Sequence, residues 1–269
     1  MPDLAQQKSF FAGFLQFDVK SGNIGSNLSR VEQGLAEIAA SSSKISPGII
    51  VLPELWATGF AYDKLPGLAR EIPDLLIILQ NLAAKYQINI AGSLPEYSNN
   101  SYYNTLFISG PERMAGSYRK QRVFVPMGEN TFFAPGTSPC PIQTDLGPVG
   151  AMVCYDLRFP ELLREQTIHG IDLAVIVAQW PEARIENWRI LVQARAIENQ
   201  MFIVAANRWG TTGDTTFGGH SMIIAPDGSI LLEAGKNEEF KGIMLDLKLL
   251  DAARSLFRTV PHGETKGEK

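Results

Sequence analysis

The chain alternates short, almost wholly apolar segments with segments in which apolar residues recur every three or four positions. Residues 9–17 and 48–52 are apolar runs of the length typical of strands. The apolar residues between these two runs follow the helical period, and they are Leu28, Val31, Leu35 and Ile38. The first 52 residues therefore predict a strand, a helix and a second strand.

The same alternation returns in the second half of the chain. Strands are predicted over 148–154, 172–178 and 201–207, and helices from about Pro160 and over 184–200. The remaining predicted elements are a helix over 72–86, strands over 88–94 and 242–247, and hairpins over 104–119 and 220–234. Strands that alternate with helices in two similar halves predict an α/β fold, an α-β-β-α sandwich of two mixed β-sheets flanked by helices.

The chain carries no low-complexity linker, so residues 1–269 are predicted to form a single domain. The segment 120–144 is rich in Pro and Gly and has little periodicity, which predicts an irregular loop of the length that is often functional. The tail from about residue 262 has nothing apolar to bury, and we expect it to be mobile.

Charge and composition narrow the classes of function. The net charge of −4 and the scattered Lys and Arg residues give no basic surface for nucleic acid. We find no secretion signal and no apolar run long enough to cross a bilayer, which predicts a soluble, cytoplasmic protein without a membrane partner. Cys140 and Cys154 are too few for a disulfide framework, and the three scattered His residues predict no metal site.

Cys154 ends an apolar strand in the segment "GAMVCYDLRFPELLR", residues 150–164. Pro160 suits the first turn of the helix that follows, so Cys154 is predicted on the connecting turn, where helix amides would lower the pKa of its thiol. Such a cysteine is either a nucleophile or a small buried hydrophobic residue, and this segment alone leaves both interpretations open.

A nucleophilic cysteine needs a base, and neither His169 nor His220 lies in a recognisable cysteine-protease pattern. Glu54 follows an apolar strand, where it is either a paired functional carboxylate or a solvated loop residue. Lys120 closes a hairpin strand, where the default assignment is a surface lysine. Each of these two signals is weak when it stands alone.

Taken in order along the chain, these segments resemble the nitrilase superfamily of carbon-nitrogen hydrolases over nearly the whole length. "LPELWATGF" resembles the Glu motif of the family, "YRKQRVF" its Lys motif and "GAMVCYDLRFPE" its Cys motif. Further similarity lies in "YYNTLFI", "ARAIENQMFIVAANR" and "GHSMIIAPDG". The nitrilase-like α-β-β-α sandwich that the family implies agrees with the fold predicted above.

The resemblance implies a role for each motif residue. Cys154 would be the nucleophile, Glu54 the general base, and Lys120 the cation beside the developing oxyanion, together with the backbone N–H of Tyr155. Glu129, in "GENTFFAPG", would be the second glutamate of many family members; its alternative is a surface carboxylate. A Lys between two carboxylates should stay charged, and its loss should damage the transition state more than folding.

The segments "CYDLRFPEL" and "QWPEARIENW" are most similar to the omega-amidase-like branch, whose members hydrolyse the distal amide of short dicarboxylate monoamides such as 2-oxoglutaramate. Arg158 would then pair with a substrate carboxylate, or else hold the turn or an interface. Trp180 would line the pocket, or else be a core or interface aromatic. The loop aromatics Phe60, Tyr62, Phe132 and Phe133 would line the entrance or cover a subunit contact.

The resulting hypothesis is a cofactor-free, cysteine-dependent amidase that forms a thioester from a small-molecule amide and associates as a homodimer or higher homo-oligomer. Other nitrilase-superfamily activities remain open, namely deaminated glutathione amidase, carbamoyl-amine hydrolase and nitrilase. A non-catalytic interaction protein is disfavoured because all four motif residues are retained. A metal-dependent amidohydrolase is disfavoured by the low His content.

Overall fold

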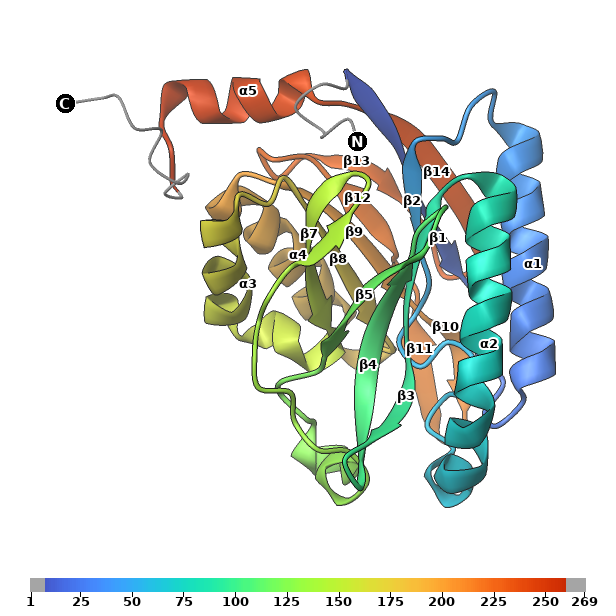
Figure 1. Ribbon diagram of the computed structural model, residues 1–269. Helices are drawn as coiled ribbons and strands as arrows, with labels where there is room; N and C mark the ends of the chain where they lie inside the picture. Colours follow the sequence, from blue (N-terminus) through green and yellow to red (C-terminus); the bar gives the residue numbers. More distant parts are fainter. Residues whose placement is uncertain (1–7, 260–269) are drawn as a thin grey trace.

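The computed structural model describes residues 8–259, and it contains two six-stranded β-sheets packed face to face (Figure 1). The first sheet has the order β14 (Glu239–Asp246), β1 (Ser9–Gln16), β2 (Gly48–Val51), β3 (Asn89–Ser98), β4 (Ser101–Ser109) and β5 (Met114–Arg119). The second has the order β13 (Ile230–Glu233), β12 (Met222–Ile224), β9 (Phe202–Asn207), β8 (Leu173–Ala178), β7 (Gly147–Val153) and β6 (Ile142–Thr144). A small hairpin of β10 (Trp209–Thr212) and β11 (Thr215–Gly218) stands apart from both.

Helices cover the outer face of each sheet, which completes the predicted α-β-β-α sandwich (Figure 1). α1 (Ile24–Ser41) and α2 (Leu65–Tyr86) pack on the first sheet, and α3 (Pro160–Gln166) and α4 (Ile185–Asn199) pack on the second. α5 (Lys248–Leu256) follows β14. The side chain of Asn23 accepts a hydrogen bond from the Ser26 N–H and so caps α1, and Pro160 opens α3 as predicted.

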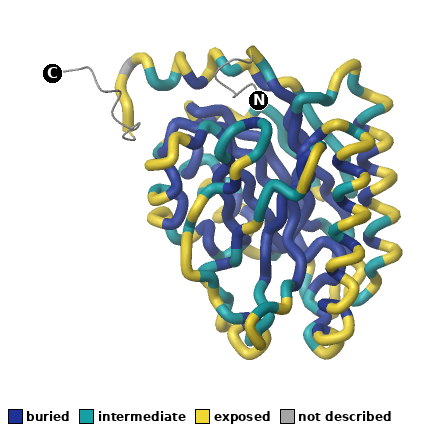
Figure 2. Tube along the Cα trace, in the orientation of Figure 1, coloured by how far each residue is buried: buried dark blue, intermediate teal, exposed yellow. Residues whose placement is uncertain are grey.

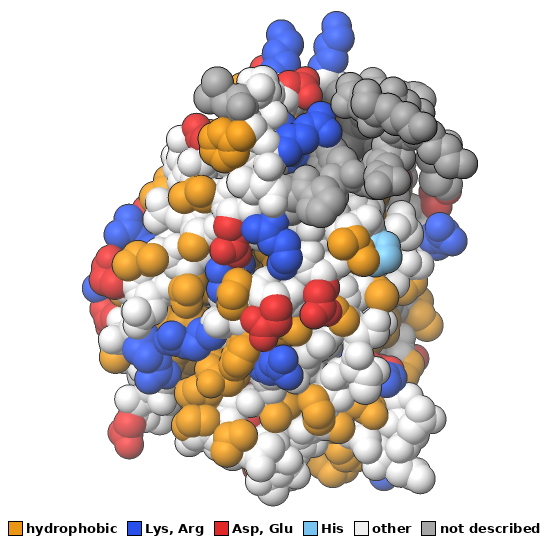
Figure 3. Space-filling view, turned by 90° about the vertical axis from the view of Figure 1, so that its left-hand side faces the viewer, with side chains coloured by type: hydrophobic (Ala, Val, Ile, Leu, Met, Phe, Trp, Pro, Cys, Tyr) orange, Lys and Arg blue, Asp and Glu red, His pale blue; other side chains and the backbone are white. Residues whose placement is uncertain are grey.

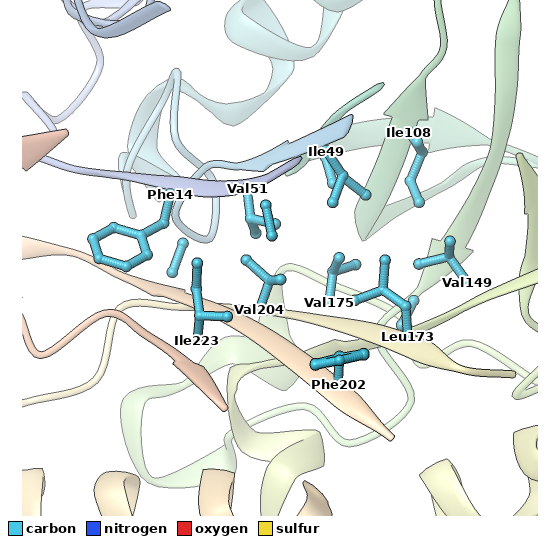
Figure 4. Packing of buried hydrophobic residues seen from close by; sticks show 14 of the residues in the cluster. Phe14, Ile49, Val51, Ile108, Val149, Leu173, Val175, Phe202, Val204 and Ile223 are labelled. Atoms are coloured by element: carbon cyan, nitrogen blue, oxygen red, sulfur yellow. The ribbon is translucent and has the colours of Figure 1, made fainter. Parts of the chain in front are cut away.

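The strands at the centre of each sheet are buried on both faces, which explains their unbroken apolar sequence. In β1, Phe10 and Phe14 point between the sheets, whereas Phe11 and Leu15 point toward α1 and α2. Figure 4 shows the layer between the sheets, where Phe14 and nine other labelled side chains from both sheets meet. In Figure 2 these strands are dark blue, which marks buried residues, whereas the outer sides of the helices are yellow, which marks exposed ones.

Both sheets have a parallel centre, β1–β2–β3 in one and β7–β8–β9 in the other. Antiparallel strands extend each centre on both sides. Because parallel strands end at the same edge of a sheet, the residues that follow β2, β7 and β8 are brought to one end of the sandwich. This edge is where the sequence motifs gather.

The predicted strands, helices and hairpins are present, and several further elements were not predicted. β6 and two 3₁₀ turns, Val125–Met127 and Glu129–Thr131, lie within the predicted loop 120–144. The strands of the hairpin β10–β11 are four residues long and partly exposed, so periodicity could not reveal them. The prediction also omitted α5, although Leu249, Leu250 and Ala253 recur there at helical spacing. The tail from residue 262, predicted to be mobile, lies outside the described residues.

Figure 3 looks onto the side of the molecule that carries α3, where hydrophobic side chains lie between basic and acidic ones. Ile168, Ile190 and Ile197, in and around α3 and α4, are more than half exposed. Such side chains are compatible with the predicted homo-oligomer, which stays a prediction. Across residues 8–259, none of the helices combines the length and the apolar character needed to cross a bilayer.

Candidate active site

The four residues implied by the motifs meet at the end of the sandwich where the parallel strands finish. Glu54 follows β2 and Lys120 directly follows β5, so both come from the first sheet. Cys154 directly follows β7 of the second sheet, and Glu129 opens a 3₁₀ turn in the loop between the sheets. All four line one cavity of about 370 Å³. Residues up to 100 positions apart in the chain therefore form one site.

The Lys120 ammonium lies between two carboxylates. Its Nζ is 2.9 Å from Glu54 Oε1 and 2.8 Å from each carboxylate oxygen of Glu129. Exposure of the three side chains is only 3% for Lys120, 0% for Glu54 and 2% for Glu129. Asn104 Nδ2 donates to Glu54 Oε1 at 2.8 Å. The surface alternatives for all three residues are therefore wrong.

The two carboxylates keep the lysine charged. Burial alone would lower the pKa of Lys120, but Glu54 and Glu129 outweigh it and hold that pKa well above its ordinary value. This agrees with the charged lysine expected from the sequence. A fixed, buried cation is the arrangement that stabilises a developing oxyanion.

Cys154 directly follows β7 and opens the short 3₁₀ helix Cys154–Arg158, which connects β7 to α3, so it lies on the connecting turn as predicted. Its φ of 48° lies in the left-handed region, which non-glycine residues adopt at some energetic cost and which often marks a functional position. Its side chain packs against apolar clusters on both faces of the second sheet and also lines the cavity. The cysteine is thus partly a core residue, but one presented to a cavity.

The predicted lowering of the Cys154 pKa is wrong. Burial and the neighbouring Glu54 carboxylate raise the pKa of the thiol well above its ordinary value, and Lys120 opposes them only in part. Cys154 is therefore a neutral thiol next to a carboxylate, and its proton must leave as it attacks.

Glu54 is held by a chain of hydrogen bonds from the second sheet. The backbone N–H of Gln179 donates to Glu54 Oε2 at 3.1 Å, and Gln179 Nε2 donates to the Glu54 carbonyl at 2.7 Å. Arg208 Nη1 in turn donates to Gln179 Oε1 at 2.9 Å, while Nη2 pairs with Asp18 at 2.8 Å. Gln179 and Arg208 had no local sequence signal, because their partners are distant in the chain.

The predicted substrate-binding residues also line the cavity. Arg158 is exposed, and its guanidinium lies 4.9 Å from the centre of the Trp180 ring. Trp180 is buried, and its Nε1 donates to the Arg184 carbonyl at 2.9 Å, so it is both a core aromatic and a wall of the cavity. Tyr155 lines the cavity as well.

The four loop aromatics divide into two pairs. Phe60 and Tyr62 line the cavity. Phe132 stacks on Tyr62 with ring centroids 4.4 Å apart, and Phe133 is buried. Neither of these two residues lines the cavity. The lining residues that the sequence did not single out are Phe124, Met127, Gln179, Pro181 and Arg184.

Within the described part of the chain, no group of three or more His, Cys, Asp and Glu side chains is placed to hold a metal ion. The acidic residues of the cavity are instead occupied by Lys120.

Residues 11–254 match the family model described as carbon-nitrogen hydrolase. The chain belongs to this family. It is 35% identical over 237 residues to the 2-oxoglutaramate amidase of Bacillus subtilis (strain 168), covering 87% of this chain and 90% of that protein. It is 31% identical over 212 residues to the omega-amidase YafV of Escherichia coli (strain K12), covering 78% and 80%.

Among solved structures, the fold is similar to that of XC1258 from Xanthomonas campestris, a CN-hydrolase superfamily protein with an arsenic adduct in its active site. The TM-score is 0.85 at 25% identity, covering 93% of this chain and 96% of that one. The α-β-β-α nitrilase fold is confirmed. This carbon-nitrogen hydrolase lies in the omega-amidase-like branch of the nitrilase superfamily and acts on carbon–nitrogen bonds other than peptide bonds.

Proposed function

We propose that this protein is a cysteine-dependent amidase that hydrolyses the distal amide of a small linear amide bearing a carboxylate, of the 2-oxoglutaramate class. The observation that carries the proposal is the Glu54–Lys120–Glu129 cluster beside the Cys154 thiol in one small cavity. A nucleophile, a proton acceptor and a fixed cation are the groups that amide hydrolysis needs.

In the first half of the reaction, Glu54 accepts the Cys154 proton as the sulfur attacks the amide carbon. A C–S bond forms, and the electron pair of the carbonyl moves to its oxygen. Lys120 and the backbone N–H of Tyr155 stabilise this oxyanion. When the carbonyl reforms, Glu54 gives its proton to the nitrogen, the C–N bond breaks, and ammonia leaves a thioester behind.

In the second half, water attacks the thioester carbon and Glu54 takes one of its protons. The C–S bond then breaks, the carboxylic acid leaves, and the proton on Glu54 returns to Cys154. Glu129 does not transfer a proton in this scheme. It accepts hydrogen bonds from Lys120 and from the backbone N–H of Phe124, and so it holds the cation and the loop together.

Two arginines support a substrate that carries a carboxylate. Arg158 and Arg184 both line the cavity, and their guanidinium groups lie against the rings of Trp180 and Phe124. Among the described residues, neither arginine forms an ion pair with an acidic side chain. Free guanidinium groups suit a carboxylate, and the relative in Bacillus subtilis is named for 2-oxoglutaramate.

A panel of substrates tests the proposal through the release of ammonia. We expect turnover of 2-oxoglutaramate and related monoamides of short dicarboxylates, with inactivation by a thiol alkylator and no effect of chelators. Deaminated glutathione, a carbamoyl amine and a nitrile complete the panel. Turnover of a nitrile but not of 2-oxoglutaramate would contradict the omega-amidase assignment, and activity that resists alkylation but not chelators would contradict the mechanism.

The arginines should act on substrate binding and not on the chemical step. Arg158→Gln and Arg184→Gln are each expected to raise KM for a carboxylate-bearing amide by about 10- to 100-fold, because a charge-assisted hydrogen bond contributes roughly 1.5–3 kcal/mol. Steady-state kinetics should show a much smaller change for a neutral amide of the same length.

Arg70→Gln is the matched control, because Arg70 is an exposed residue of α2 that does not line this cavity. Its KM should equal that of the wild type. Equal losses on neutral and charged amides in the two cavity variants would refute a role in carboxylate binding.

A further inference from the structure

Asp156 is a fully buried carboxylate that accepts four hydrogen bonds. Its Oδ1 accepts from the backbone N–H groups of Gln121 at 3.2 Å and Arg122 at 2.8 Å. Its Oδ2 accepts from the Tyr118 hydroxyl at 2.9 Å and from the backbone N–H of Val153 at 3.1 Å. Three of the partners are backbone N–H groups, which can only donate, and an ionised carboxylate accepts from all three and from the Tyr118 hydroxyl together.

These donors come from both sheets. Tyr118 lies in β5 and Gln121 follows it, so they bracket Lys120. Val153 is the last residue of β7 and directly precedes Cys154. One carboxylate therefore ties the segment that carries the cation to the strand that carries the thiol.

We propose that Asp156 is a positioning residue that fixes the Lys120 ammonium relative to the Cys154 thiol. The proposal rests on the reaction roles proposed for those two residues. Asp156 does not line the cavity, so it acts through its neighbours and not on the substrate. The hydrogen bond to Val153 also fixes the backbone just before the left-handed turn at Cys154, a conformation that persists only where the surroundings hold it.

The positioning depends on the ionised form of Asp156. Burial raises the pKa of Asp156 to about 6, against the opposing effects of Lys120 and of hydrogen bonds that include those from Val153 and Tyr118. Protonation puts a hydrogen on one oxygen and removes the negative charge, and hydrogen bonds to a neutral carboxyl group are weaker than those to a carboxylate. The link between the two segments is therefore strong at pH 7 to 8 and weakens as the pH falls through about 6.

Tyr118 and Lys120 act directly on Asp156, whereas Glu54 and Glu129 reach it only through Lys120. Tyr118, whose pKa is raised by burial and by Asp156, stays protonated. Lys120 stays charged, and the thiol of Cys154 stays neutral in this range. Arg122 pairs with the exposed Glu161 at 3.6 Å.

Asp156→Asn tests the proposal with almost no change in shape. The amide oxygen can still serve Gln121 and Arg122, and the Tyr118 hydroxyl can turn to accept, but the new NH₂ group faces the N–H of Val153. We expect kcat to fall about 10- to 100-fold, as for other small misplacements, with KM within about threefold. The fall in kcat below about pH 6, the acid limb of its pH profile, should disappear. Tm should fall as well, because the buried N–H of Val153 loses its acceptor.

Tyr118→Phe is the matched variant, because it removes one donor and keeps the three backbone hydrogen bonds. The plateau of kcat should stay within about threefold of the wild type, since backbone positioning is retained. The Tyr118 hydrogen bond lowers the pKa of Asp156, so its loss should move the acid limb to higher pH. If Asp156 had only a structural role, these variants would change Tm, and the acid limb of the kcat profile would stay at the same pH.

Alkylation of Cys154 gives a readout that needs no turnover, in a Cys140→Ser background where Cys154 is the remaining cysteine. Displacement of Lys120 should raise the pKa of the thiol, and a rise of one unit slows alkylation about tenfold. Asp156→Asn with wild-type kcat and alkylation rate would overturn the proposal. If that variant does not fold, a Tyr118→Phe profile that superimposes on the wild type overturns it instead. Slower alkylation in a protein that hydrolyses no amide would refute the proposed function and keep the positioning role.

Discussion

Replacing Cys154 with alanine is expected to abolish amide hydrolysis, with a loss of about 10⁴-fold or more in kcat, because no other group of the cavity can form the thioester. The fold should survive. Alanine removes only the sulfur, and it meets the same left-handed backbone conformation that cysteine already adopts. Ammonia release measures the loss, and thermal unfolding checks the fold.

Cys140→Ser is the control for this prediction, because Cys140 is exposed and lies outside the cavity. Its activity should equal that of the wild type. Mass spectrometry after rapid acid quenching should detect an acyl adduct on the wild type and on Cys140→Ser, and none on Cys154→Ala. An alanine variant that retains a tenth of the wild-type activity would refute the cysteine mechanism.

The fold could be predicted from the sequence largely because its strands are buried on both faces. Runs such as those of β1 and β8 are apolar without interruption, and the helices between strands show a clear period of three and four. The same reasoning missed β10–β11, whose strands are short and partly exposed, and α5, where Leu249, Leu250 and Ala253 recur at helical spacing over only nine residues. Burial and length together decided which elements the sequence revealed.

The motif residues could be predicted from the sequence, but their burial and the pKa of the Cys154 thiol could not. Lys120 and Glu129 looked locally like surface residues, and only the ion cluster explains why both are buried. The pKa of the Cys154 thiol was predicted from the helix that follows it, whereas burial and the Glu54 carboxylate, distant in the chain, raise that pKa. Electrostatics at this site depend on contacts across the two sheets, which no local pattern contains.

The supporting residues were missed for the same reason. Asp156 stands inside the Cys motif, yet three of its four hydrogen bonds go to residues more than 30 positions away. Gln179 reaches Glu54 across 125 positions. Their residue types are common in turns, so only the assembled structure separates them from solvated polar residues.

Lys120→Met is expected to lower both kcat and the free energy of unfolding. The sequence led us to expect that loss of Lys120 would damage the transition state more than folding, and the buried ion cluster adds a cost in stability. Removal of an oxyanion partner costs about 10²- to 10³-fold in kcat. Removal of the cation also leaves Glu54 and Glu129 buried without a positive partner, and breaking such a pair costs roughly 3–5 kcal/mol. Denaturant unfolding at pH 8 should therefore show a large loss of stability.

The difference in stability between Lys120→Met and the wild type should shrink as the pH falls from 8 to 5. Without the cation, the two buried carboxylates bind a proton more tightly in the folded chain than in the unfolded chain. The folded variant therefore takes up extra protons as the pH falls, and its free energy of unfolding rises. Lys248→Met, at an exposed position of α5, is the control and should match the wild type at every pH. A stability difference between Lys120→Met and the wild type that does not depend on pH would contradict the buried ion cluster, and wild-type kcat in the folded variant would contradict the oxyanion role of Lys120.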